Sequence, residues 1–152
     1  MSATILLASL HHLAAFSVVA LLAIEVATFR PPFTVPQATR LQRVDLLFGL
    51  SALVLLIVGL MRVTWFEKGP AYYWHDLFFL IKFGAFLIAA LISIYPTVVM
   101  QSWNRSLRGG AAPQVSEACR ARVRLCLMCE LTAIAVILPC AALMARGAGF
   151  LR

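Results

Sequence analysis

Charged residues are scarce in this chain. Of its 152 residues, 12% are Asp, Glu, Lys or Arg, whereas 62% are apolar. Soluble globular domains contain about a quarter charged residues, so this composition excludes an ordinary water-soluble domain. Among the charged residues, acidic ones are the less common, with 6 Asp and Glu against 13 Lys and Arg. The length allows one domain.

The motifs of common soluble enzymes are also absent. The sequence has no glycine-rich phosphate loop, no G-x-S-x-G motif and no H-E-x-x-H motif. No Lys or Arg precedes Arg30, and the first apolar run extends too far for the apolar region of a signal peptide. We therefore predict that this run is retained as a membrane span and is not cleaved.

Four long apolar runs account for most of the chain. They cover approximately residues 3–29, 44–65, 74–100 and 123–145. About 20 apolar residues are enough for a helix to cross the hydrocarbon core of a bilayer. The sequence therefore predicts an all-α, four-helix transmembrane bundle that forms one integral membrane domain over residues 1–152.

The basic residues predict how this bundle is oriented. Eight of them lie in or beside the first and third connectors: Arg30, Arg40, Arg43, Arg105, Arg108, Arg120, Arg122 and Arg124. Four lie on the opposite side: Arg62, Lys68, Arg146 and Arg152. Cytoplasmic loops carry the excess of Lys and Arg, so we expect a bacterial inner-membrane protein with both termini in the periplasm. Orientation and anionic lipid explain the basic charge, and we expect no nucleic-acid partner.

Ionisable side chains inside the apolar runs are the best pointers to function, because a charge in hydrocarbon is costly. Five such residues belong to the outer half of the bundle, which holds both termini. They are His11, His12, Arg62, His75 and Lys82. A rise of about 1.5 Å per residue brings Lys82 closer in depth to His11 than His75 is. A step of about 100° per residue predicts that His75 and Lys82 share one stripe of the third run.

We interpret this outer group as a haem site. Four-helix bundles hold cofactors between facing helices, and imidazole nitrogens are common haem ligands. An uncharged lysine amine is a second type of iron ligand. His11 and Lys82 are therefore the predicted iron ligands of a haem b, with His12 or His75 as alternatives. Arg62 or Lys82 would bind the haem propionates.

The alternative interpretation of the outer group is structural. His11 and His12 would form hydrogen bonds between helices, and Lys82 would neutralise a buried carboxylate. Asp76 is the acid that the sequence places nearby, at the membrane surface. With so few acids, several polar groups would remain unpaired in hydrocarbon at a cost of several kcal/mol each. This imbalance favours the haem interpretation.

Three acids form an inner group. Glu25, Asp45 and Glu130 lie toward the side that carries most of the arginines. The simplest interpretation is that they form charge pairs with arginines that fix the helix ends. The alternative is a proton relay through the membrane.

The cysteines suggest a metal or redox site at first sight. Cys126 and Cys129 form a C-x-x-C motif, with Cys119 upstream. The motif lies on an apolar helix near the cytoplasm, where thiols stay reduced, and it lacks the further ligands of a zinc site. We expect these cysteines to be inert.

Four segments resemble a bacterial family of small predicted membrane proteins, a domain of unknown function. The segments are residues 10–12 (LHH), 43–49 (RVDLLFG), 66–73 (FEKGPAYY) and 93–97 (SIYPT). The resemblance covers nearly the whole chain. It implies four membrane spans and no established activity.

The architecture is also similar to that of the haem-containing, four-helix protoporphyrinogen oxidases of bacteria and of copper-resistance-type four-helix membrane proteins. In those oxidases a His early in the first span and a Lys early in the third belong to the haem site. His11 (or His12) and Lys82 match these places. The aromatic and glycine-rich pattern that follows the oxidase histidine is replaced here by residues 14–17 (AAFS).

Three functions follow as hypotheses. The first is a haem b protein that acts in electron transfer or tetrapyrrole redox chemistry, with a redox partner. The second is a non-catalytic accessory subunit of a larger membrane complex. The third is a proton-coupled transporter that uses Glu25, Lys82 and Glu130 and forms a homo-oligomer, since four spans are few for a transporter.

Overall fold

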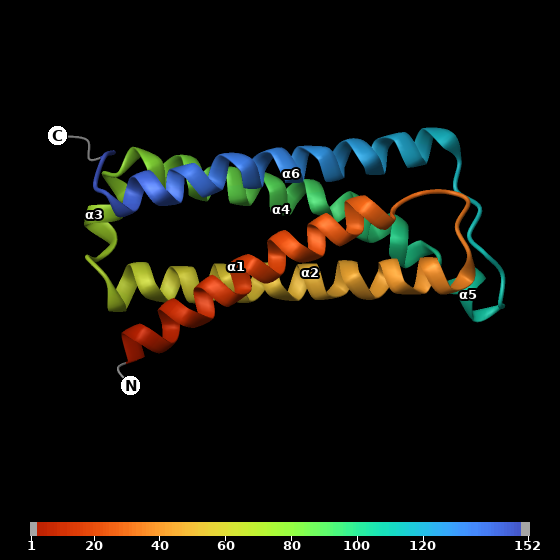
Figure 1. The fold of residues 1–152 in the computed structure, drawn as a ribbon, viewed down its shortest axis with the longest axis horizontal. Coiled ribbons are helices and arrows are strands. Elements are labelled where there is room, and N and C mark those ends of the chain that lie inside the picture. Colours follow the sequence, from red (N-terminus) through yellow and green to blue (C-terminus); the bar gives the residue numbers. More distant parts are fainter. Residues whose placement is uncertain (1–2, 150–152) are drawn as a thin grey trace.

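A computed structural model of the chain describes residues 3–149. Its elements are α1 (Ala3–Thr28), α2 (Val35–Met61), the π-helical turn η1 (Arg62–Phe66), α3 (Pro70–Trp74), α4 (Leu77–Ser102), α5 (Asn104–Arg108) and α6 (Glu117–Ala145). Figure 1 shows α2, α4 and α6 running roughly along the long axis of the molecule, while α1 crosses α2 obliquely. The predicted all-α, four-helix class is confirmed.

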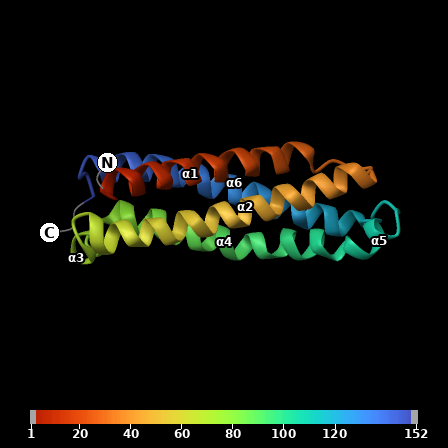
Figure 2. The ribbon, with the colours of Figure 1, turned by 90° about the horizontal axis from the view of Figure 1, so that it is seen from below.

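The bundle consists of two helical hairpins. Helix α1 packs mainly against α2, and α4 packs mainly against α6, while fewer contacts join α1 to α6 and α2 to α4. Figures 1 and 2 show the start of α1, the turn at α3 and the end of α6 at one end of the bundle. We call this the outer end. The connectors after α1 and after α4 lie at the opposite, inner end.

Helix α2 begins well before the apolar run that marks it in the sequence. The helix begins at Val35 and so extends beyond the span predicted from residue 44. The side chain of Thr34 caps the helix by accepting a hydrogen bond from the backbone N–H of Gln37 at 3.3 Å. Helix α6 likewise begins before residue 123, with Ser116 accepting from the N–H of Cys119 at 3.3 Å. Polar side chains continue both helices beyond the hydrocarbon.

Two helices share the stretch predicted as the third span. The short helix α3 ends at Trp74, and α4 begins at Leu77 after Asp76, whose carboxylate accepts from the N–H of Phe79 at 3.0 Å. His75 belongs to the turn between the two helices. The predicted stripe shared by His75 and Lys82 is therefore wrong, because the two residues do not lie on one helix.

The side chains divide into a packed interior and an apolar surface. At the inner end, Trp103 stacks on Phe29 with ring centroids 6.5 Å apart and also contacts Phe33. Along the outside of the helices, Phe16 is 73% exposed and Leu91 is 68% exposed. Soluble monomers rarely expose such large apolar patches. The four helices are long and apolar enough to span a membrane, so this surface faces lipid.

The charge distribution predicts the topology of this bundle. A cytoplasmic reporter such as a fluorescent protein, inserted after Arg108, should be active, because the inner end carries the larger share of basic residues. A periplasmic reporter such as alkaline phosphatase should be active at the C-terminal end. The reverse pattern of activities would show that the bundle is inverted.

Candidate functional site

Three carboxyl groups meet inside the bundle. Glu25 of α1, Asp45 of α2 and Glu130 of α6 are 1%, 3% and 2% exposed. Glu25 interacts electrostatically with both other acids, and Glu130 with Asp45. Each acid lies on the buried face of its helix. In α1 the buried residue Leu22 lies one turn before Glu25, and in α6 the buried residue Leu127 lies one turn before Glu130. We call these three residues the carboxyl cluster.

The carboxyl cluster has few hydrogen-bonding partners. The Thr97 hydroxyl of α4 donates to Asp45 Oδ1 at 2.7 Å. Asp45 Oδ2, Glu25 Oε1 and Glu130 Oε1 are buried without a hydrogen-bond partner. All four long helices therefore contribute to this polar layer, and three of its six carboxyl oxygens remain available.

No arginine within residues 3–149 forms a salt bridge with the carboxyl cluster. Within residues 3–149 the salt bridges join Arg62 to Glu67 and Arg120 to Glu117. The expected charge pairs of Glu25 and Glu130 are therefore wrong. The arginines at the inner end, such as Arg124, lie on the exposed side of their helices, where water and lipid headgroups solvate them better than the interior would.

A second polar group lies in the outer half and consists of His11, Arg62 and Lys82, which we call the outer cluster. His11 interacts electrostatically with both cations, and Lys82 with Arg62. Three helical segments supply these side chains: α1, η1 and α4. The structure therefore brings together three of the five residues predicted for the haem site.

The His11 ring is held against the backbone of α2. A Cβ atom placed on Gly59 would lie 3.1 Å from His11 Cε1, so glycine permits this close approach. The backbone of Leu55 lies beside the imidazole. His11 Nδ1 is buried and has no hydrogen-bond partner. Lys82 Nζ contacts Met144 Sδ of α6 at 3.8 Å.

His12 and His75 are both exposed, unlike the members of the outer cluster. The His12 ring lies edge-on to that of His11, with ring centroids 6.2 Å apart. The Nδ1 atom of each exposed histidine contacts a carbonyl oxygen of its own chain segment. For His12 this is Ala8 O at 2.6 Å, and for His75 it is Ala71 O at 2.7 Å. These contacts hold each ring against the backbone of its own segment and not against Lys82.

Glu67 is a member of this region that sequence reasoning missed. Its carboxylate binds the Arg62 guanidinium at 2.7 Å. Nearby, burial raises the pKa of the Tyr73 phenol, and the Glu67 carboxylate adds to this effect. The expectation that Asp76 is the only acid nearby is therefore wrong.

The cysteines are all free thiols. Cys126 is half-buried and Cys129 exposed, while the Tyr95 hydroxyl contacts Cys119 Sγ at 3.9 Å. Among residues 3–149, no group of three or more His, Cys, Asp or Glu side chains is arranged to hold a metal ion. The C-x-x-C motif thus gains no further ligands from the fold.

Four apolar helices with their polar side chains turned inward define an integral membrane four-helix bundle. The chain belongs to the DUF2214 family of predicted membrane proteins, whose sequence profile matches residues 3–149. This confirms the family resemblance of the sequence. The chain matches no curated protein and no solved structure.

The hydrogen bond to Asp45 predicts a stability difference between two threonine variants. Thr97→Val removes the donor to Asp45 and should lower the free energy of unfolding by about 0.5–2 kcal/mol. The matched control is Thr132→Val, because the exposed Thr132 hydroxyl donates to Met128 O of its own helix. Unfolding by dodecyl sulfate in mixed micelles would measure both. Equal stabilities would show that the Thr97 bond contributes nothing.

Proposed function

We propose that this protein binds haem b in the outer half of the bundle and acts in electron transfer or tetrapyrrole redox chemistry. The observation that carries the proposal is the outer cluster, where His11 and Lys82 from different helices turn toward the same interior region. His11 Nδ1 is buried there without a hydrogen-bond partner. A buried polar atom without a partner is costly unless a ligand satisfies it.

The surroundings of His11 fit an iron ligand. A histidine that binds a metal through one nitrogen usually donates its other N–H to a carbonyl or carboxylate, which fixes the ring. The Leu55 backbone lies beside the imidazole and would supply such a carbonyl. Gly59 allows the ring to lie close to α2, which restricts its orientation. His12 has neither feature, so the structure supports His11 as the ligand over its neighbour.

The cations of the outer cluster fit the rest of a haem. Lys82 takes part in none of the salt bridges of residues 3–149. Its amine contacts the thioether of Met144 and lies 5.7 Å from the centre of the Phe79 ring. Arg62 uses one nitrogen for Glu67, while its Nε is buried without a partner. We assign Lys82 as the second iron ligand and Arg62 as the partner of a propionate.

A bound haem would supply one-electron chemistry. The protein would hold the iron through His11 and Lys82 and keep water away from it with the apolar surroundings of α1, α2 and α4. We further propose that the bundle lies in the bacterial inner membrane with both termini, and therefore the outer cluster, toward the periplasm. An electron partner, alone or in a larger membrane complex, would then approach from that side.

Absorption spectra of detergent-purified protein from haem-replete cells test this proposal. The wild type should show a Soret band, and His11→Ala and Lys82→Ala should each weaken or shift it. The matched controls are His12→Ala and Lys68→Ala, which remove exposed residues of the same types. Glu25→Gln should also leave the band unchanged. A folded but colourless wild type would contradict the proposal.

A glycine variant tests the same site without removing a ligand. Gly59→Ala places a Cβ at 3.1 Å from His11 Cε1 and should displace the ring, so the Soret band should shift or weaken. Gly49→Ala on the same helix is the control, because a Cβ there meets no atom within 4 Å. Identical spectra for the two alanine variants would place the haem away from His11.

The carboxyl cluster favours a second candidate function, proton transfer through the membrane. Three nearly fully buried acids without arginine partners resemble the intramembrane acids of proton relays. In proteoliposomes under a membrane potential, wild-type protein should acidify or alkalinise the lumen, and Glu130→Gln should abolish this flux. The Glu117→Gln variant, whose carboxylate lies at the start of α6, is the control. Absence of flux in the wild type would remove this candidate.

A further inference from the structure

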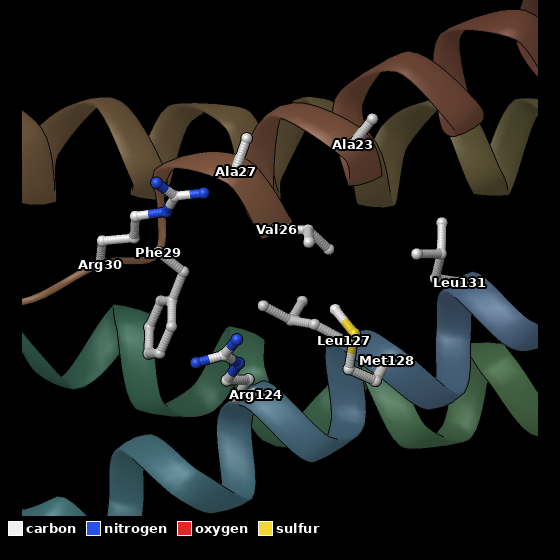
Figure 3. A pocket seen from close by; sticks show the side chains of 9 residues that line it. All are labelled: Ala23, Val26, Ala27, Phe29, Arg30, Arg124, Leu127, Met128 and Leu131. Atoms are coloured by element: carbon white, nitrogen blue, oxygen red, sulfur yellow. The ribbon is translucent and has the colours of Figure 1, made fainter.

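A groove of about 590 Å³ lies between α1 and α6 at the inner end of the bundle (Figure 3). It is separate from the outer cluster. Val26 and Phe29 of the first hairpin and Leu127, Met128 and Leu131 of α6 form much of its wall. This lining is apolar along most of its length.

Two arginines lie at one end of this groove. Figure 3 shows the Arg30 side chain on the α1 side, with its guanidinium turned toward Ala27, and the Arg124 guanidinium on the α6 side, beside Phe29. The apolar side chains of the lining continue from there toward Leu131. Neither arginine takes part in a salt bridge within residues 3–149. Two positive charges therefore face the groove without a carboxylate to balance them.

The two arginines also mark the membrane boundary. Arg30 is the first basic residue of the chain and follows the end of α1. Arg124 is followed by no Lys or Arg until Arg146. Each therefore stands where an apolar stretch of helix meets the basic inner end, which is the depth of the lipid headgroups. The apolar part of the groove then lies at the depth of the acyl chains.

We propose that this groove binds an anionic glycerophospholipid. Arg30 and Arg124 would hold the phosphodiester, since planar guanidinium groups bind phosphate oxygens through paired, charge-assisted hydrogen bonds. An acyl chain would lie over Val26, Leu127 and Leu131. A lipid with a zwitterionic headgroup would bring a further cation to a site that already holds two, so the net charge selects anionic lipids.

Lipid titrations followed by native mass spectrometry test this proposal on the full-length, delipidated protein in detergent. Phosphatidylglycerol should bind the wild type more tightly than phosphatidylcholine with the same acyl chains. The double variant Arg30→Gln/Arg124→Gln should weaken phosphatidylglycerol binding by roughly 30-fold, if each arginine contributes as basic residues near anionic membranes do. The control Arg40→Gln/Arg122→Gln removes the same charge from the inner end outside the groove.

Two further measurements separate headgroup from chain. Ala23→Phe fills part of the apolar wall and leaves both arginines in place, so it should also weaken phosphatidylglycerol binding. Glycerol phosphate, which has no acyl chains, should bind far more weakly than the lipid. Equal loss in the two arginine double variants, or equal affinity for the two lipids, would overturn the proposal. Binding of glycerol phosphate as tight as that of the lipid would identify an anion site and not a lipid site.

Discussion

Polar side chains inside a membrane bundle must find their partners within the protein, because hydrocarbon supplies none. This constraint explains why the charged residues of the four helices are confined to the ends and to two interior layers. The carboxyl cluster accepts a hydrogen bond from Thr97 at Asp45. The outer cluster contains a paired cation, Arg62, and a buried imidazole with one unpaired nitrogen. Both layers lie where the two hairpins meet, so the hairpin interface holds the groups that most need a ligand or a proton.

The sequence predicted the number and type of helices well, because long apolar runs in so uncharged a chain have few other solutions. Helix ends were predicted less well. Helix α2 begins at Val35 within a polar segment, because capping by Thr34 and helix-forming polar residues continue the helix beyond the bilayer. The start of α4 at Leu77 depends on capping by Asp76. An apolar run shows where a helix crosses the hydrocarbon core, whereas the capping residues determine where the helix begins and ends.

The candidate site could be predicted in part. Depth along the helices correctly grouped His11, Arg62 and Lys82, since rise per residue is a property of the chain itself. Depth cannot say which way a side chain turns, so His12 was not separated from its neighbour. Glu67 was missed because its pairing with Arg62 depends on the path of the turn that follows η1. Depth along the helices also grouped the three inner acids correctly. Their lack of arginine partners within residues 3–149 could not be predicted, because it depends on how the helices pack and not on the periodicity of the sequence.

The central claim is that His11 and Lys82 bind one iron atom inside this bundle. Pulsed electron paramagnetic resonance of the purified ferric protein tests it directly, using protein labelled with ¹⁵N in histidine alone or in lysine alone. The claim predicts that the iron couples to a ¹⁵N nucleus in each of the two preparations, one imidazole nitrogen and one amine nitrogen. Coupling to histidine nitrogens alone, or the absence of any ferric haem signal, would contradict it.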